Sequence, residues 1–420
     1  MKATDQVSAI RECKEDAALS RVYVKLSDAR ERCIAALDAY LKLFWDEEIG
    51  LFTAPGRTEV GGNHTDHNHG TVIAAAVELD MLAVAAPAKD GSVELYSEGY
   101  GWTKLNVSSL AVEPSEAGTP AALIRGVAAA MKDSGFDAGG FRAYVTSDVP
   151  GGLGLSSSAA FEVLIACILS HLYNGGRVSP TEAAIMGRYA ENVYFGKPCG
   201  LMDQTACAVG GFICIDFQDP QNPVVRPVPQ LGGGYALCIV DTRADHEGLT
   251  EEYAAMPGEM RAVARELGGT VLRDVSEVAL YENAARVRFV CGDRAFLRAA
   301  HFFREDARAR AQADMLENGD TEAFLELVRA SGRSSYMYLQ NVYTAADSKK
   351  QPVAVALCLS EHLLQGRGAF RVHGGGLAGT IQAWVPNDLL EEYRAGMDAV
   401  FGPGSCAVPG IRQTGIAQIL

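Results

Sequence analysis

The pattern of hydrophobic and polar residues predicts a chain that mixes helices and strands along its whole length. Segments in which apolar residues recur at helical spacing predict helices, namely parts of 1–50, then 119–134, 159–173, 180–195, 251–267 and two helices within 294–330. Short apolar runs are typical of strands, namely 92–96, 141–145, 235–240, 369–372 and 380–385. The longer apolar run at 72–86 predicts a hairpin or two successive strands.

The start of one predicted helix carries a specific capping signal. Ser179 is followed by Pro180 and, three residues after the serine, by Glu182. This is the pattern of a capping box with proline at the first helical position. We expect the helix to end at about Phe195, because Gly196 follows it.

The length of the chain and the distribution of its turn-forming residues predict two domains. The 420 residues, 48% of them hydrophobic, can bury a large core, and this length is typical of two domains or one large one. Turn-forming residues gather in 219–229. The predicted division therefore places 1–220 in an N-terminal unit and 221–420 in a C-terminal unit.

Charge and apolar content exclude several classes of partner. A formal net charge of −15 argues against a nucleic-acid or anionic-membrane partner, since both favour a basic surface. No apolar run reaches the ~18 residues that a membrane span needs, and the first residues lack the apolar core of a signal peptide. We therefore expect a cytoplasmic protein with no membrane partner, and a monomer is its expected state.

A stretch rich in glycine and serine, 149–160, joins a predicted strand to a predicted helix. The residues suited to holding an anion are Gly151, Gly152, Gly154, Leu155, Ser156, Ser157 and Ser158. Glycines let the backbone approach a phosphate, the unpaired N–H groups at a helix start attract an anion, and serine hydroxyls supply donors or a ligand for Mg²⁺. The stretch therefore predicts a phosphate site, and the alternative is an ordinary glycine-rich turn capped by serine.

The segment 51–70 is rich in glycine, histidine and asparagine. It is too polar for the core and too long for a simple turn, which is typical of a functional loop. We expect polar contacts with a ligand from Arg57, His64 and Asp66. The alternative is a metal site at His64, His67 and His69, although their spacing lacks the i, i+4 pattern of helical zinc sites.

Asp203 and a late glycine cluster each leave two interpretations open. Asp203 lies beside Gln204 in a segment whose other residues are small or apolar, so it is either a structural carboxylate with partners or a catalytic one. The glycines within 373–379 separate two predicted strands. They form either a plain hairpin or a second backbone platform against a ligand.

Three stretches taken together resemble the galactokinase branch of the GHMP small-molecule kinases. They are 55–66 (Pro-Gly-Arg-Thr-Glu-Val-Gly-Gly-Asn-His-Thr-Asp), the Gly-Leu-Ser-Ser-Ser run at 154–158, and the glycine-rich 374–379. The likeness also includes 199–204 and 241–253, so it covers most of the chain after about residue 45. Each signal is weak or moderate alone, and their order and spacing make the set strong.

The resemblance implies a fold and a reaction. The fold is the two-lobed α+β GHMP kinase fold with mixed sheets, and its active site lies in the cleft between the lobes. The N-terminal lobe carries the sugar signature and the phosphate loop, and the C-terminal lobe carries the late glycine motif. The implied reaction is the transfer of a phosphoryl group from ATP, with Mg²⁺, to the anomeric hydroxyl of a sugar, galactose first among the candidates.

The resemblance also implies roles for individual residues, carried over by position. Asp203 resembles the catalytic aspartate and Arg57 its cationic neighbour, while Ser158 and Glu191 fall where the family holds Mg²⁺. The positions that contact the sugar are Asn63, His64, Asp66 and Tyr253. Phosphoryl transfer needs positioning and charge stabilisation above all. Asp203 would then accept or orient the hydroxyl proton, and Arg57 would keep that carboxylate ionised.

Two departures from the family bear on the choice of substrate. The chain has Asn63 where the galactokinase signature has glutamate, and Glu59 where asparagine is usual. An amide still forms hydrogen bonds but loses the charge-assisted bond to a sugar hydroxyl. The alternatives are therefore a GHMP kinase for a related sugar, such as a galactosamine, arabinose or uronic acid derivative, and a galactokinase-like sugar sensor without catalysis. A P-loop kinase is excluded, because no Gly-x-x-x-x-Gly-Lys-Ser/Thr motif is present.

Overall fold

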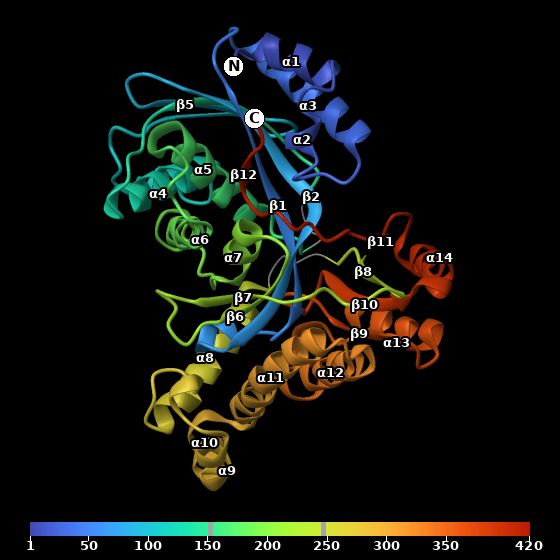
Figure 1. Ribbon diagram of the computed structural model, residues 1–420. Helices are drawn as coiled ribbons and strands as arrows, with labels where there is room; N and C mark the ends of the chain where they lie inside the picture. The colour runs from blue at the N-terminus through green and yellow to red at the C-terminus, as the bar shows by residue number, and fades with distance from the viewer. Residues whose placement is uncertain (150–153, 245–248) are drawn as a thin grey trace.

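The computed structural model describes residues 1–149, 154–244 and 249–420, and its elements follow most of the predicted pattern (Figure 1). The α-helices are α1 Ala3–Arg11, α2 Asp16–Leu19, α3 Leu26–Leu43, α4 Pro120–Asp133, α5 Ser157–Asn174, α6 Pro180–Tyr189, α7 Met202–Val209, α8 Thr250–Glu266, α9 Glu277–Glu282, α10 Ala284–Cys291, α11 Asp293–Asn318, α12 Thr321–Ser334, α13 Pro352–Leu364 and α14 Leu390–Phe401. The strands are β1 Gly50–Gly61, β2 Thr71–Pro87, β3 Ser92–Ser97, β4 Gly101–Asn106, β5 Phe141–Ser147, β6 Phe212–Asp216, β7 Val224–Pro227, β8 Tyr235–Asp241, β9 Ala369–Val372, β10 Thr380–Pro386, β11 Cys406–Ala407 and β12 Ala417–Gln418.

The capping box that the sequence predicts is present at the start of α6. The Ser179 hydroxyl accepts a hydrogen bond from the Glu182 amide at 3.2 Å, and the Glu182 carboxylate accepts one from the Ser179 amide at 2.7 Å. After Tyr189 the chain continues as a π-helical turn, Ala190–Phe195. The predicted end near Phe195 is confirmed, with a wider last turn of the kind that often marks functional sites.

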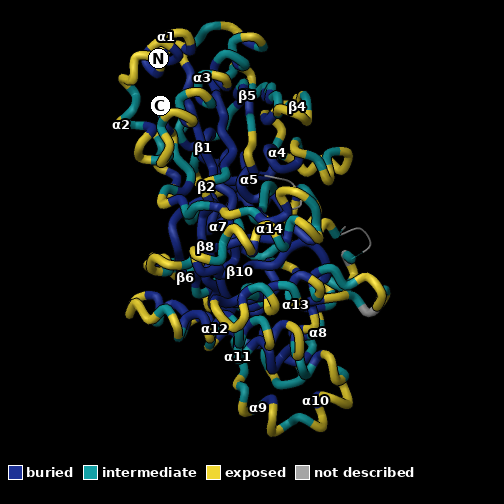
Figure 2. The backbone as a smooth tube through the Cα atoms, turned by 90° about the vertical axis from the view of Figure 1, so that its right-hand side faces the viewer, coloured by how far each residue is buried: buried dark blue, intermediate teal, exposed yellow. Residues whose placement is uncertain are grey.

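An eight-stranded sheet forms the core of the first half of the described chain. Its main path runs β12-β1-β2-β5-β3-β4, with β6 beside β2 and β7 beside β6, and β3 and β5 pair in parallel. Helices α4 to α7 pack against one face and α1 to α3 against the other, so the central strands are buried on both sides (Figures 1 and 2). This burial explains why their sequences are nearly continuously apolar.

The run 72–86 is one strand, which corrects the predicted hairpin or pair of strands. β2 is 17 residues long, and it pairs with β6 in its first half, with β5 in its second half and with β1 along most of its length. The acids within it do not mark a turn. Asp80 is fully buried and forms ion pairs with Arg32 and Arg412, so its charge is stabilised inside a continuous strand.

A second, four-stranded sheet has the order β11-β8-β10-β9. Helices α13 and α14 pack with these strands around a separate apolar core, and α8 to α11 form a further helical cluster (Figure 1). The change from the first sheet to the second falls between β7 and β8. The division at residues 220 and 221 stays a prediction, because the strand β12 near the C-terminus pairs with β1 and returns to the first sheet.

Arg412 anchors this returning segment. Its side chain is buried and donates to the Asp80 carboxylate at 2.7 Å and to the Thr53 hydroxyl at 2.9 Å. Burial alone would raise the pKa of Asp80, but Arg412 and Arg32 outweigh it and hold that pKa below its usual range. The C-terminal segment is therefore fixed to β1 and β2 by charge as well as by strand pairing.

No helix within the described ranges is long and apolar enough to cross a membrane.

We expect Arg412→Met to lower the free energy of unfolding by about 3 kcal/mol, because it leaves a buried carboxylate with one ionic partner fewer. Arg394→Met is the matched control, since Arg394 forms a half-exposed pair with Glu391 at 3.3 Å, and such pairs contribute about 1 kcal/mol or less. Urea denaturation monitored by circular dichroism measures both. Equal effects of the two substitutions would contradict a structural role for Arg412.

Candidate active site

A pocket of about 240 Å³ collects residues from three distant parts of the chain. The parts are β1 with the loop after it, the segment that leads into α7, and the loop between β9 and β10. The lining residues are Arg57, Glu59, Gly62, His64, Asp66, His67, Lys197, Pro198, Cys199, Gly200, Met202, Asp203, Gly374 and Gly375. The pocket therefore lies where residues of the first sheet meet a loop of the second.

Strand β1 delivers two of these side chains to the pocket. Arg57 and Glu59 are two residues apart, and alternate residues of a strand point to the same face. The pairing of β1 with β2 shifts register between Pro55 and Arg57 and again between Glu59 and Gly61. These bulges bracket the two residues, and bulges commonly re-aim side chains at functional sites.

Arg57 and Asp203 form a two-pronged ion pair. The Arg57 Nε donates to Asp203 Oδ1 at 2.8 Å, and a terminal nitrogen donates to Oδ2 at 2.6 Å. The Ser156 hydroxyl also donates to Oδ2, at 2.5 Å. Burial would raise the pKa of Asp203, but Arg57 and then Ser156 outweigh it and hold that pKa below its usual range.

The two partners differ in their access to the pocket. The Arg57 side chain is 7% exposed, whereas the Asp203 side chain is 35% exposed. Asp203 lies in the first turn of α7, and the helix start presents its carboxylate to the open side. A group inside the pocket can therefore reach Asp203, while Arg57 acts on it from behind.

The described part of the glycine- and serine-rich stretch, from Gly154 onward, lies next to the Arg57–Asp203 pair. Gly151 and Gly152 lie outside the described residues. Gly154 and the buried Leu155 accept hydrogen bonds from Arg57 through their carbonyl oxygens, at 2.5 and 3.0 Å. Ser156 has a left-handed backbone (φ 56°) and directly precedes α5, whose first residues are Ser157 and Ser158.

Ser158 and Glu191 meet although they are 33 residues apart. The Ser158 hydroxyl donates to Glu191 Oε1 at 3.4 Å. Glu191 is buried, and it also accepts from Lys197 at 3.0 Å and from Gln204 at 3.0 Å. The neighbouring Glu162 carboxyl has a pKa raised to about 9, first by burial and then by the charge of Glu191. Glu162 is therefore neutral at pH 7.

Two predicted sugar-contact residues, Asp66 and His64, line the pocket. Asp66 accepts a hydrogen bond from the His67 amide at 2.9 Å, and a side chain at Gly200 would overlap its carboxylate. His64 is half-buried, with Nε2 3.0 Å from the Gly375 carbonyl. Burial and then the charge of His67 lower the pKa of His64 to about 4. The neutral ring donates through Nε2, so its Nδ1 is an acceptor.

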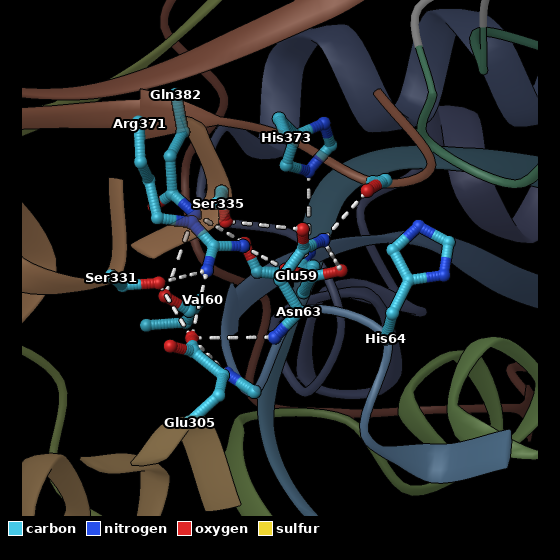
Figure 3. A network of polar contacts seen from close by, with 12 residues as sticks. Glu59, Val60, Asn63, His64, Glu305, Ser331, Ser335, Arg371, His373 and Gln382 are labelled. Atoms are coloured by element: carbon cyan, nitrogen blue, oxygen red, sulfur yellow. Dashed lines mark hydrogen bonds and ion pairs between the residues drawn. The ribbon is translucent and has the colours of Figure 1, made fainter. Parts of the chain in front are cut away.

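The other two predicted sugar-contact residues, Asn63 and Tyr253, are not among the described residues that line the pocket. Asn63 is fully buried, and its amide nitrogen donates to the Glu59 carboxylate and to the Gly374 carbonyl (Figure 3). The Tyr253 hydroxyl donates to the Gly376 carbonyl at 2.7 Å. Both residues therefore support the β9–β10 loop, and a direct sugar contact from either stays a prediction.

The three histidines of 51–70 do not gather around one point. His64 and His67 stack with their ring centres 6.3 Å apart, and His69 ends the short 3₁₀ turn Asp66–Asn68 with a left-handed backbone. Among the described residues, no group of three or more His, Cys, Asp or Glu side chains is placed to hold a metal ion. The arrangement gives no support to the alternative of a histidine metal site.

The glycines of 373–379 form the predicted hairpin, and their use as a platform against a ligand stays a prediction. They connect β9 to its antiparallel neighbour β10 as a hairpin. Their backbone also lines the pocket through Gly374 and Gly375.

Among the pocket residues with acidic side chains or with lysine or arginine side chains, two were not assigned a role from the sequence, Glu59 and Lys197. In the sequence, Glu59 is noted only as a departure from the signature. Its position two residues after Arg57 could have placed both side chains on the same face of a strand. Lys197 follows a helix-ending glycine and carried no signal of its own. Its partner Glu191 precedes it by six residues across a turn that the sequence did not specify.

The comparisons with known proteins agree with this geometry. Residues 122–211 match the family description "GHMP kinases N terminal domain", and residues 38–87 match "Galactokinase galactose-binding signature". A galactokinase from Streptomyces coelicolor is 31% identical over 368 residues, which cover 86% of this chain and 89% of that protein. A galactokinase from Actinobacillus pleuropneumoniae is 32% identical over 347 residues, covering 81% and 86%.

Solved structures share the fold. The structure of Lactococcus lactis galactokinase complexed with galactose has a TM-score of 0.78 at 24% identity, covering 91% of this chain and 98% of that one. Methanococcus jannaschii mevalonate kinase has a TM-score of 0.58 at 15% identity, covering 84% and 95%. The α+β fold is therefore that of the GHMP kinases, and the chain belongs to the galactokinase family.

Proposed function

We propose that this protein is an ATP-dependent sugar 1-kinase that phosphorylates galactose to galactose 1-phosphate. The observation that carries the proposal is the Arg57–Asp203 pair, whose carboxylate faces a pocket of sugar size beside the start of α5. Relatives named galactokinase, and a solved galactokinase that holds galactose, support the choice of sugar. A monomer in the cytoplasm remains the expected state.

In this proposal Asp203 acts on the sugar hydroxyl that is to be phosphorylated. Its ionised carboxylate accepts the proton of that hydroxyl or orients it for attack on the terminal phosphate of ATP. Arg57 keeps the carboxylate ionised and places a fixed positive charge beside the transferring group. The amide groups at the start of α5 are suited to the phosphates of ATP, because the N-terminus of a helix carries unpaired donors.

The residues at Ser158 and Glu191 fit a magnesium ion. A hydroxyl and a carboxylate are hard oxygen ligands, which Mg²⁺ prefers together with phosphate oxygens and water. Glu191 already takes two cationic or amide donors, so its position is fixed before any ion binds. When bound, the ion would neutralise the phosphate oxygens of ATP.

Two alternatives remain testable. A GHMP kinase for a related sugar would use the same pair with a different substrate, and a sensor would bind without turnover. Asp203 is ionised and accessible, which favours a catalyst. A coupled ADP-release assay over galactose, galactosamine, arabinose and galacturonic acid separates these cases. We expect galactose to have the highest kcat/KM, and a preference of tenfold or more for another sugar would overturn galactose as the substrate.

We expect Asp203→Asn to lower kcat by about 10²–10⁴-fold with little change in ATP binding, because the amide has the same shape but cannot accept the proton. Asp216→Asn is the matched control. Asp216 pairs with Arg273 and is 32% exposed, close to the value of Asp203, but it lies outside the pocket. Steady-state kinetics measures both variants. Near-normal kcat in Asp203→Asn would make this carboxylate structural.

We expect Arg57→Gln to move the acid limb of the kcat/KM profile to higher pH. Arg57 holds the pKa of Asp203 low, so its removal raises that pKa. Because the ionised form is the active one, activity is present above this pKa and is lost as the pH falls through it. Initial rates between pH 4.5 and 8 test the shift, and an unchanged apparent pKa would separate Arg57 from the ionisation of Asp203.

We expect Ser158→Ala to raise the Mg²⁺ concentration needed for half-maximal activity, and Glu191→Gln to raise it further, because the second change removes a charge from a site for a hard cation. Glu47→Gln is the matched control, since it weakens an ion pair with Arg142 outside the pocket. Rates measured at fixed ATP over a Mg²⁺ series decide the point. An unchanged dependence in both variants would remove these residues from the metal site.

A further inference from the structure

Glu59 is a buried carboxylate that lines the pocket and is held from behind by Arg371. The Glu59 side chain is 4% exposed, and Arg371 on β9 is fully buried. A terminal nitrogen of Arg371 forms an ion pair with Glu59 Oε1, and Asn63 Nδ2 lies 3.1 and 3.3 Å from the two carboxylate oxygens (Figure 3). The carboxylate is therefore fixed in one orientation against the pocket.

A second carboxylate behind Arg371 makes this support rigid. Arg371 donates to the Ser331 hydroxyl at 2.8 Å and lies 3.5 Å from Glu305 Oε1. Ser331 in turn donates to the same Glu305 oxygen at 2.5 Å. The guanidinium thus sits between two acids, of which Glu59 lines the pocket and Glu305 does not. Such a costly buried network keeps its geometry only when its members are paired.

Asn63 takes part in this support rather than in the pocket wall. Its Nδ2 donates to Glu59 and to the Gly374 carbonyl, the latter at 2.7 Å, and its Oδ1 accepts from Asn341 at 2.9 Å. Both ends of the amide are therefore engaged by the protein. At this pair of positions the carboxylate available to a ligand belongs to residue 59.

The pocket wall is rich in acceptors. Glu59, Asp66 and Asp203 all line it, and Arg57 is paired with Asp203. Carboxylates accept hydrogen bonds from hydroxyls and repel other carboxylates. The wall therefore suits a neutral sugar with several hydroxyls and disfavours a uronic acid.

We propose that Glu59 is a specificity-determining residue whose Oε2 accepts a hydrogen bond from one hydroxyl of the substrate. Asn63 and Arg371 are positioning residues that hold this carboxylate. Oε2 has the weaker protein contact of the two oxygens, a 3.3 Å approach from Asn63, whereas Oε1 takes Arg371. The inference rests on the proposed sugar kinase function and names the group that selects the sugar.

The exchange of residue types in the signature agrees with this assignment. Where the family pattern has asparagine and then glutamate, the chain has Glu59 and then Asn63. The pair retains one carboxylate and one amide, which contact each other directly. The acid has therefore moved from one partner to the other, and Arg371 supplies the countercharge at its new position.

A series of galactose analogues that each lack one hydroxyl tests the proposal. For the wild type, kcat/KM should be far lower with one analogue than with the others. That analogue lacks the hydroxyl that donates to Glu59, so the carboxylate is left without a partner. In Glu59→Gln, the discrimination against that analogue should fall by about tenfold or more, since the charge-assisted bond is lost. The discrimination against the other analogues and KM for ATP should remain as in the wild type.

Glu47→Gln is the matched control, because it removes a carboxylate that is paired with an arginine, Arg142, outside the pocket. It should leave the order and size of discrimination unchanged. Glu59→Asp is the second variant, since it keeps the charge beside Arg371 but shortens the reach, and it should weaken the same discrimination by about fivefold or more. If Glu59→Gln and Glu59→Asp both retain the wild-type discrimination, or if Glu47→Gln loses it equally, the proposal is overturned.

Calorimetric titration of the same sugars without ATP separates the two levels of inference. If the wild type binds galactose and discriminates against one analogue but does not phosphorylate galactose, the kinase proposal fails. The role of Glu59 is then tested by whether Glu59→Gln reduces that discrimination in binding. If the wild type phosphorylates galactose and Glu59→Gln binds every analogue in the wild-type order, the kinase proposal stands. In that case the role assigned to Glu59 is wrong.

Discussion

The ion pair between Arg57 and Asp203 is the interaction on which the arrangement of the site depends. A guanidinium buried to 7% exposure is stable only with its partners in place. Those partners are Asp203 in α7 and the Gly154 carbonyl just before α5, and the main-chain amide of Arg57 in β1 also donates to the Leu155 carbonyl. Because Arg57 connects β1, α7 and the segment before α5, it fixes the position of the Asp203 carboxylate relative to the start of α5.

The rest of the fold keeps β1 from moving. Its neighbour β2 is buried on both faces, and the charge cluster of Asp80 with Arg412 ties the C-terminal segment to the same two strands. The register shifts on either side of 57–59 lie within the part of β1 that pairs with β2. They therefore change the direction of side chains without ending the strand. The site is therefore built on a rigid element, with loops contributing the remaining wall.

Local signals in the sequence predicted local structure well. The capping box at Ser179, the two helices within 294–330 and the apolar strands of the second sheet are all present, because each depends on residues close together in the chain. The predictions that were wrong or incomplete depend on distant partners. The acids in 72–86 suggested a turn, but Asp80 is neutralised by Arg32 and Arg412, and Glu59 gained its role from Arg371, 312 residues away. The spacing of residues along the chain does not predict ion pairs between distant residues. Comparison with a family signature shows only that a residue differs from the usual one, and not which distant residue it contacts.

Two arginines compensate two of the carboxylates that line the pocket. Arg57 on β1 compensates Asp203, and Arg371 on β9 compensates Glu59. Arg57 lines the pocket and Arg371 does not, but both are buried. Without this compensation, the acids would repel the phosphates of ATP. Lys197 differs from both arginines, because it is 61% exposed while paired with Glu191. A cation on a flexible stem at the rim can leave its partner for a phosphate, whereas the buried arginines cannot. Burial therefore distinguishes these cations: the two arginines are held beside their carboxylates, whereas the exposed Lys197 can also contact an anion.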